Sequence, residues 1–390
     1  MNVSVNRPLA LVDYQQQALQ TDHLKFSDDA LGFPLLGLFG ETGSLLSEVK
    51  KKHRDSVSYL GYAHSVLEEF GDVLWYLTTV ARRGGISLAE LGANLDRTLS
   101  DWLSEAPAHL TFLDLQHAAL RRDAAPSPAF QRTLVRVAVE AGHLIAEYET
   151  GYLDNNRAAL AGRLTALLRS LRDAANEAGV SLNDVAQANL VKIFDRWPAH
   201  RIYPPLFDDG FPLAEQIPRE FVINVQESTE GGRSVVNLFC GGRRLGDPLT
   251  DNRQADDDYR FHDVFHLAYA AILGWSPSLR RLLRIKRKSD PKIDEAEDGA
   301  RAILIEEGIA TWIFNHAQRL ELFRNTTTLD YGLLKNVREF VKGYEAERCP
   351  LWLWEEAILQ GFEMFRAVKK YRGGRCTASL ATRTIRFERL

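Results

Sequence analysis

The sequence predicts a mainly α protein, an all-α helical bundle of two tandem repeats followed by a C-terminal α+β domain. Three observations lead to this prediction. Apolar residues recur at helical spacing through residues 8–105 and 129–197, short motifs recur in the same order within that half, and Pro-rich and β-type segments appear after about residue 200. The predicted domains are 1–105, 106–200 and 201–390.

The composition is that of an ordinary globular protein. The 390 residues are 45% hydrophobic and 26% charged, and they are enough for two or three domains with cores of their own. The net charge of −4 argues against general nucleic-acid binding. The three cysteines lack metal-type spacing, which suits a reducing compartment. Because we find no signal-peptide core and no apolar run of ~20 residues, we expect a cytoplasmic protein without a membrane partner.

Helical spacing defines four helices in the first hundred residues. Residues 8–21 are expected to form the first helix, residues 35–51 the second and residues 66–81 the third. A fourth is expected over residues 86–102, with Ser87 as its N-cap. The first half is therefore predicted to be a bundle.

Four acids stand inside the second and third of these helices: Glu41, Glu48, Glu69 and Asp72. At about 100° per residue, Glu41 and Glu48 project within about 20° of each other, and Glu69 and Asp72 share a face because they are three apart. The neighbouring Glu68 is expected to be the exposed acid of its helix. A carboxylate in an apolar interior costs several kcal/mol unless a positive charge neutralises it, so the pattern predicts a bound cation. The alternative is ordinary surface charge on solvated helices.

The expected cation follows from the ligand chemistry. Oxygen ligands without Cys or His favour a hard cation, which indicates Mg²⁺ or Mn²⁺.

Two motifs of the first repeat return in the second. EAGHLIAE at 140–147 aligns with ETGSLLSE at 41–48, and GVSLNDVAQANL at 179–190 aligns with GISLAELGANL at 85–95, with one inserted residue. Two matches in the same order predict a duplication, with chance likeness of helical hairpins as the alternative.

The second repeat lacks acids of the first. In the alignment of the two repeats, Arg163 corresponds to Glu69 and Ala166 corresponds to Asp72. Arg163 is expected to neutralise one of the two glutamates of segment 140–147.

These motifs resemble those of the MazG-type nucleoside triphosphate pyrophosphohydrolases, whose mark is an E-x-x-E helix followed by an E-x-x-D helix. GLFGETGSLLSEVKK and LEEFGDVLWYL represent the two helices here, and the family's N-x-x-K is present at residues 189–192 and, altered, at 94–97. The resemblance covers about half of the chain, while the C-terminal half resembles a MazG-associated region only loosely. One departure matters, because Ser44 replaces the second glutamate of E-x-x-E; Glu48, one helical turn on, is the expected substitute.

The resemblance implies Mg²⁺-dependent hydrolysis of nucleoside triphosphates, deoxynucleotides and modified nucleotides included, to a monophosphate and pyrophosphate. Members of the family work as dimers, so the two repeats are expected to form a pseudo-dimer within one chain, and a homo-oligomer also stays open. The implied metal and catalytic residues are Glu41, Glu48, Glu69 and Asp72, with Glu41 or Glu48 as the general base. The implied substrate-binding residues are Asn189, Lys192, Asn94 and Arg97.

This assignment of residues predicts one composite site. The first repeat would hold the metal, and Asn189 and Lys192 of the second would meet the substrate phosphates. The alternative for Asn189 and Lys192 is an ordinary polar helix face.

The second half has a mixed pattern. We expect a Pro-rich linker over 201–218 and a β-hairpin or meander after it, and we expect a turn at Gly373-Gly374. The expected strands are 220–228, 231–240 and one within 377–390, and the expected helices are 259–275, 294–320 and 333–370. The basic run 280–288 is expected to be a solvated loop, with binding of phosphate or nucleic acid as the alternative.

A second metal site is predicted in this half. His262 and His266 are four apart on an apolar helix, a spacing that can chelate one ion, with Asp263 as a further ligand or its supporting group. Glu306 and Glu307 stand in the middle of another apolar helix and complete a plausible set for a divalent transition metal. The alternative is that the histidines hydrogen-bond within the core and a glutamate pairs with Arg260 or Arg301.

Three functions follow from these patterns. The first is a nucleoside triphosphate pyrophosphohydrolase with an accessory domain. The second is a non-enzymatic nucleotide sensor that signals through the C-terminal domain. The third places the chemistry at His262 and His266, as a metal hydrolase.

Overall fold

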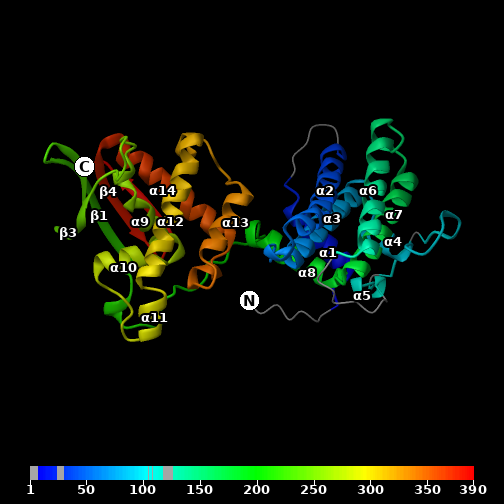
Figure 1. The fold of residues 1–390 in the computed structure, drawn as a ribbon, viewed down its shortest axis with the longest axis horizontal. Helices are drawn as coiled ribbons and strands as arrows, with labels where there is room; N and C mark the ends of the chain where they lie inside the picture. The colour runs from blue at the N-terminus through cyan, green and yellow to red at the C-terminus, as the bar shows by residue number, and fades with distance from the viewer. Residues whose placement is uncertain (1–7, 24–29, 104, 108, 117–125) are drawn as a thin grey trace. The chain divides into compact units, whose positions relative to one another are not determined.

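The protein consists of two compact units, Met1–His200 and Arg201–Leu390 (Figure 1). The structure, a computed structural model, describes residues 8–23, 30–103, 105–107, 109–116 and 126–390. Residues 1–7, which belong to the segment used to predict that a signal peptide is absent, lie outside the described residues. No helix of the described residues is both long enough and apolar enough to cross a bilayer.

The described residues of the first unit form an all-helical bundle (Figure 1). Helix α2 packs along α3, α6 packs along α7, and the two pairs meet through α2 and α6, while α8 packs against α3. Phe70, Leu74 and Leu77 recur at helical spacing on α3 and are fully buried. The helices are α1 Leu11–Ala18, α2 Gly32–Asp55, α3 Tyr62–Arg83, α4 Leu88–Ala93, α5 Phe112–Leu115, α6 Pro128–Glu149, α7 Arg157–Ala178 and α8 Leu182–Arg196.

The fourth predicted helix is shorter than its pattern indicated. It begins as expected, because the Ser87 hydroxyl accepts a hydrogen bond from the Glu90 amide, but it ends at Ala93. Asn94 ends it, since its side-chain amide donates to Leu103 O and its side-chain oxygen accepts from Leu103 N, both at 2.8 Å. A side chain that bonds the backbone nine residues on replaces the next helical turn with a loop.

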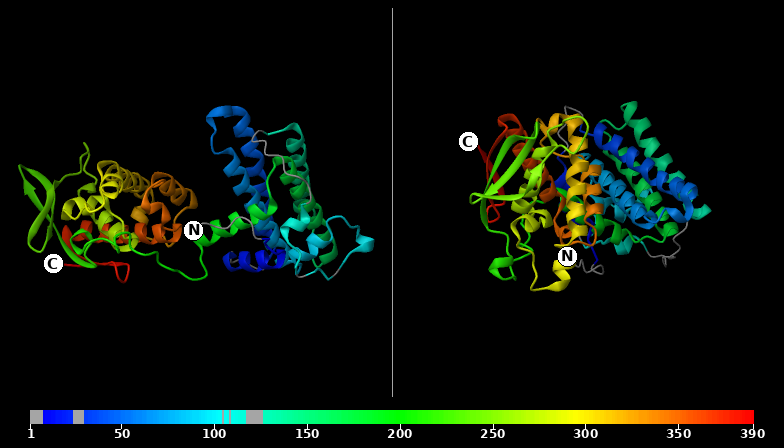
Figure 2. Two further views of the ribbon diagram at one scale, coloured as in Figure 1. Left: turned by 90° about the horizontal axis from the view of Figure 1, so that it is seen from below. Right: turned by 60° about the vertical axis from the view of Figure 1, so that its left-hand side comes forward.

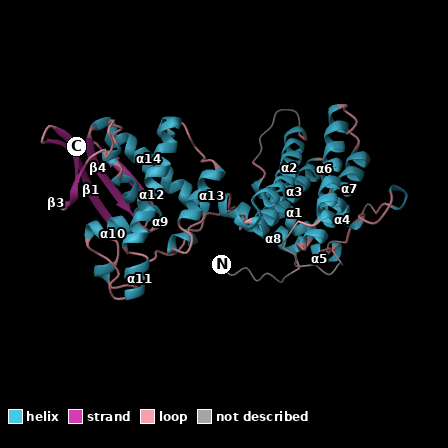
Figure 3. Cartoon of the chain, viewed as in Figure 1, coloured by secondary structure: helices cyan, strands magenta, loops and turns pink. Residues whose placement is uncertain are grey.

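The strands that the structure describes all lie in the second unit and form one antiparallel sheet of order β3-β2-β1-β4-β5 (Figure 3). Consecutive strands β1, β2 and β3 are the predicted meander, which is confirmed. The strands are β1 Glu220–Glu230, β2 Arg233–Cys240, β3 Arg243–Leu249, β4 Gly373–Ser379 and β5 Thr384–Glu388.

The predicted turn at Gly373-Gly374 is wrong, because both residues open strand β4. Their φ angles are 138° and 149°, which side-chain-bearing residues rarely adopt. A Cβ on Gly374 would lie 2.2 Å from the Phe387 ring, so glycine is needed where β4 meets β5.

Helices α9 and α14 pack on each other and against β4 and β5, so they cover that part of the sheet (Figure 2). Predicted helix 333–370 is in fact two helices, interrupted where Gly343 has a φ of 83° and where Pro350 precedes α14. Predicted helix 294–320 is likewise divided before Gly299. The helices are α9 Asp263–Leu273, α10 Pro277–Leu283, α11 Pro291–Ala296, α12 Ala300–Ala317, α13 Tyr331–Phe340 and α14 Leu351–Tyr371.

The expectation of a solvated loop at the basic run 280–288 is wrong for two of its arginines. Arg280 and Arg287 are each 1% exposed. Arg280 Nη2 lies 2.6 Å from Asp208 Oδ2, and Arg287 Nη2 lies 2.7 Å from Asp298 Oδ1. The two guanidinium groups are therefore buried structural ion-pair partners, which the sequence could not show because their acids lie elsewhere in the chain.

Candidate functional site

Three of the four predicted acids of the first unit meet at the contact between α2 and α3. Oxygen atoms of Glu41 on α2 and of Glu69 and Asp72 on α3 lie within 4.8 Å of one another. The i, i+3 spacing places Glu69 and Asp72 on one face of α3, and the packing of α2 along α3 brings Glu41 to that face. We call these three residues the acid cluster.

The acid cluster is partly withdrawn from water. Glu69 Oε2 is buried and has no hydrogen-bond partner among the described residues. Burial, followed by the charges of Asp72 and Glu41, raises the pKa of Glu69 to about 7. Burial and then Asp72 also raise the pKa of Glu41. Carboxylates that raise one another's pKa in this way lack sufficient positive charge, which a divalent cation would supply.

Two residues of α8 complete this face. Lys192 Nζ lies 2.5 Å from Asp72 Oδ2 and 2.9 Å from Glu68 Oε1. The side-chain amide of Asn189 donates to Asp72 Oδ1 at 3.4 Å, while its oxygen accepts from the Tyr14 hydroxyl at 2.9 Å. Asn189 and Lys192 are thus brought directly to the acid cluster.

The close approach of α8 to α3 depends on a small residue. A Cβ on Gly71 would lie 3.0 Å from Asn189 Cβ, which is tighter than ordinary contact. The glycine of the EEFGD motif therefore lets α8 lie against the face that carries Asp72.

Glu48 lies apart from the acid cluster. It is 3% exposed, its Oε1 lies 2.5 Å from Lys51 Nζ, and its Oε2 accepts from the Tyr59 hydroxyl. Seven residues of helix rise about 10.5 Å. Glu48 and Glu41 therefore point in nearly the same direction from α2 but lie about two turns apart along its axis. The Ser44 hydroxyl, which stands one turn from Glu41, partly offsets the rise in the pKa of that carboxylate.

Asn94 and Arg97 have other partners. Asn94 is fully buried, and its side chain forms hydrogen bonds with the backbone of Glu90 and Leu103. Arg97 is exposed, with its Nη1 3.4 Å from Asp101 O. Asn94 therefore closes a loop, whereas the hydrogen bonds of Asn189 connect Tyr14 with the acid cluster.

Helices α6 and α7, which the sequence alignment relates to α2 and α3, carry an ion pair and not an acid cluster. Arg163 Nε donates to Glu147 Oε1 at 2.9 Å, and Glu140 Oε2 lies 3.6 Å from His143 Nδ1. Of the two glutamates expected to pair with Arg163, Glu147 is the one that does.

Glu68 is a residue of this site that the sequence did not predict. It was expected to be exposed, yet its side chain is only 11% exposed and it binds Lys192. Its position four residues before Asp72, on the same helix face, was the signal that could have found it.

The predicted histidines of the second unit also meet with acids. Ligand-type atoms of His262, Asp263 and His266 lie within 4.8 Å of one another, and the three residues are 6%, 7% and 1% exposed. Glu307 lies beside them, with Oε2 3.6 Å from His262 Nε2 and Oε1 3.2 Å from His266 Nε2. We call His262, Asp263, His266 and Glu307 the histidine cluster.

Glu306 supports this cluster from the other side. It is fully buried, and its Oε1 lies 2.9 Å from His266 Nδ1. The Ser276 hydroxyl donates to Glu306 Oε1 at 2.7 Å and the Ser278 amide donates to Oε2 at 2.8 Å. Neither serine carried a recognisable sequence signal.

The charges of the histidine cluster are strongly coupled. Burial alone would lower the pKa of His266, but Glu306 and Glu307 outweigh it and raise that pKa. Burial alone would raise the pKa of Glu307, but the neighbouring imidazoles of His262 and His266 lower it. The carboxylates of Glu306 and Glu307 therefore favour a positively charged group between them.

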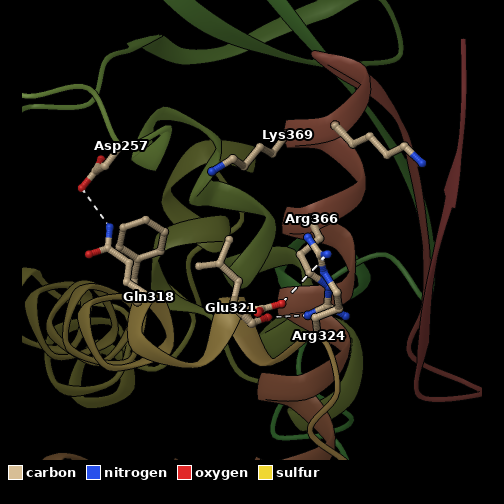
Figure 4. A pocket seen from close by; sticks show the side chains of 9 residues that line it. Asp257, Gln318, Glu321, Arg324, Arg366 and Lys369 are labelled. Carbon is tan, nitrogen blue, oxygen red and sulfur yellow. Dashed lines mark hydrogen bonds and ion pairs between the residues drawn. The ribbon is translucent and has the colours of Figure 1, made fainter.

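A cavity of about 950 Å³ lies near this cluster, in the same unit (Figure 4). Its wall includes four basic side chains and two acidic ones, which suits an anionic ligand. None of the histidine cluster lines it; Phe314 of its wall packs on Tyr259, whose ring stacks on His262 at 4.3 Å. The charged residues of the wall are Arg324, Arg366, Lys369, Lys370, Asp257 and Glu321.

The comparisons with known proteins concern mostly the second unit. Neither the curated proteins nor the solved structures gave a match to the chain. Residues 202–390 match the family model of the MazG C-terminal domain. The second unit is therefore similar to the MazG C-terminal domain.

Proposed function

We propose that the chain hydrolyses nucleoside triphosphates to a nucleoside monophosphate and pyrophosphate, with Mg²⁺ held by the acid cluster. The observation that carries the proposal is the convergence of Glu41, Glu69 and Asp72 within 4.8 Å, with one buried oxygen of Glu69 that has no hydrogen-bond partner in the part of the chain that the structure describes. The likeness of residues 202–390 to the MazG C-terminal domain supports a nucleotide-related role.

The donor set fits the metal. Three carboxylates without a soft ligand suit Mg²⁺, with Mn²⁺ as the natural substitute. When bound, such an ion supplies charge neutralisation for phosphate oxygens and lowers the pKa of a coordinated water. Glu41, Glu69 and Asp72 are the residues that would hold it.

The side chains around the acid cluster have distinct parts in this proposal. Lys192 brings a positive charge next to Asp72 and offers its ammonium group to a phosphate oxygen. Asn189 is oriented by the Tyr14 hydroxyl, so its amide faces the same side. Glu41 is the proposed general base, because Glu48 is already engaged by Lys51 and Tyr59.

The decisive experiment measures pyrophosphate release from a panel of nucleoside and deoxynucleoside triphosphates, modified bases included. We expect turnover with Mg²⁺ or Mn²⁺ and none with EDTA. Release of inorganic phosphate alone, or turnover that persists in EDTA, would reject the proposed reaction.

A second candidate function is a nucleotide sensor. The observation that favours it is the pairing of Lys192 with Asp72, together with Ser44 at the place of a fourth acid. A lysine that neutralises one acid and a serine that adds no charge weaken the demand for a metal. The sensor predicts Mg²⁺-dependent nucleotide binding by calorimetry with no pyrophosphate release on the same panel.

A further inference from the structure

The histidine cluster has the geometry of a metal site. Tetrahedral ligands at 2.0–2.2 Å from an ion lie roughly 3.3–3.6 Å from one another. The separations here are 3.2 Å between His262 Nε2 and Asp263 Oδ1 and 3.2 Å between His266 Nε2 and Glu307 Oε1. The third, from His262 Nε2 to Glu307 Oε2, is 3.6 Å. His262, Asp263 and His266 therefore each offer a ligand atom within 4.8 Å of the others, and Glu307 brings one carboxylate oxygen to each histidine nitrogen.

The other nitrogen of each imidazole has a neighbour of its own. His262 Nδ1 lies 2.9 Å from Tyr259 O, and His266 Nδ1 lies 2.9 Å from Glu306 Oε1. Metal-binding histidines usually give their second nitrogen to a backbone carbonyl or a carboxylate, which leaves the first free for the ion. Glu306 is itself held by Ser276 and Ser278.

A simple buried ion pair accounts for these contacts less well. His266 is 1% exposed, and both of its nitrogens lie within 3.2 Å of a carboxylate, yet neither has hydrogen-bond geometry. Among the described residues, no Lys or Arg forms an ion pair with Asp263, Glu306 or Glu307. Three carboxylates facing two imidazoles leave negative charge that a divalent ion would balance.

We propose that His262, Asp263, His266 and Glu307 bind one divalent transition-metal ion. This site is separate from the acid cluster and does not depend on the function of the first unit. Imidazole nitrogens select this class over Mg²⁺, and the carboxylates suit Zn²⁺, Mn²⁺ and Fe²⁺. The Glu307 side chain is 34% exposed, so the site opens to solvent on that side and leaves room for a water or a substrate atom. Glu306 is a positioning residue that orients His266.

The test measures metal on the full-length protein. After removal of bound metal with a chelator, Co²⁺ is titrated and its visible absorption is recorded, while plasma mass spectrometry measures the metal that the protein carries from purification. We use Glu69→Gln as the background, so that the acid cluster does not contribute. One equivalent of Co²⁺ with absorption bands typical of nitrogen and oxygen ligands is expected.

Variants assign the ligands. Glu307→Gln and His262→Gln should weaken Co²⁺ binding at least 100-fold, and Glu306→Gln should weaken it by about 10–100-fold. His316→Gln, on α12 but outside the cluster, is the matched control and should bind as the parent does. A folded parent that binds no Co²⁺, or His262→Gln and Glu307→Gln proteins that bind it unchanged, would overturn the proposal.

Discussion

The Lys192 ammonium nitrogen lies 2.5 Å from Asp72 Oδ2, although 120 positions separate the two residues in the chain. The same nitrogen lies 2.9 Å from Glu68. Lys192 is thus the counterion of two acids on α3 and, in our proposal, the group that meets a substrate phosphate. A counterion alone would affect stability, whereas a phosphate-binding group would affect the KM, and the two effects can be measured separately.

Lys192→Ala should raise the KM for the best triphosphate substrate about 10–100-fold, the usual effect of losing a charge-assisted hydrogen bond. Lys51→Ala is the matched control, because Lys51 also pairs with an acid at 2.5 Å and this ion-pair partner, Glu48, is not a member of the acid cluster. Steady-state kinetics of both variants provide the measurement. Unchanged turnover and KM in Lys192→Ala would contradict the composite site.

Glu69→Gln should reduce Mg²⁺-dependent turnover about 100-fold or more, because it removes a metal-binding charge at the centre of the acid cluster. The same change at Glu48 should leave most activity, since Glu48 is occupied by Lys51 and Tyr59. The metal-free Glu69→Gln protein should also unfold at higher urea than the parent, because the change removes the charge of a carboxylate of which one buried oxygen has no hydrogen-bond partner among the described residues. Equal losses of activity in the two variants would argue against the assignment.

Asn94→Ala should destabilise the first unit by about 1–3 kcal/mol, because it removes the hydrogen bonds of a fully buried side chain to the backbone of Glu90 and Leu103. The KM should stay near that of the parent, since Asn94 closes a loop. Urea unfolding and steady-state kinetics of one preparation supply both values. A large KM increase with unchanged stability would restore Asn94 as a substrate-binding residue.

The second unit should lose stability in acid through Glu227 and Asp258. Burial alone would raise both pKa values, but hydrogen bonds, in each case from Arg372 first, lower them below the ordinary 4.5 and 3.8. A lowered folded-state pKa gives stability that is present above the ordinary pKa and is lost as the pH falls through the folded-state value.

Arg372→Gln should therefore reduce the difference in protection between pH 7 and pH 3.5, measured by amide hydrogen exchange in β1. Arg375→Gln serves as the control, because its partner Glu388 is 61% exposed and the pair contributes little. An unchanged acid response in Arg372→Gln would show that other groups control it.

The cysteines should differ sharply in reactivity. Burial raises the pKa of Cys349 and of Cys376 to about 12, and their exposures are 1% and 0%. Cys240 is only half-buried. Iodoacetamide at pH 8 should label Cys240 first and the other two only on unfolding, as mass spectrometry of the labelled peptides can establish. Early labelling of Cys376 would mean that β4 opens readily.

The sequence predicted well where the physical cause is local. Helical periodicity placed Glu69 with Asp72 and His262 with His266, because residues three and four apart always share a helix face. The same reasoning failed for Glu48, since equal angles on a helix do not imply equal heights. It also failed at Asn94, where a hydrogen bond to Leu103 stops the helix, and at Glu68, which looked like surface charge but binds Lys192.

The sequence by itself determined the mainly helical character of the chain, the change to an α+β pattern near residue 200, and which acids and histidines could act together. These properties follow from spacing along one helix or strand, so they are written in neighbouring residues. Only the tertiary structure decided that Lys192 and Asn189 reach Asp72, that Glu307 joins the histidines, and that Arg280 is buried. Such contacts depend on how helices pack, and packing is decided by the shape and burial of the whole core.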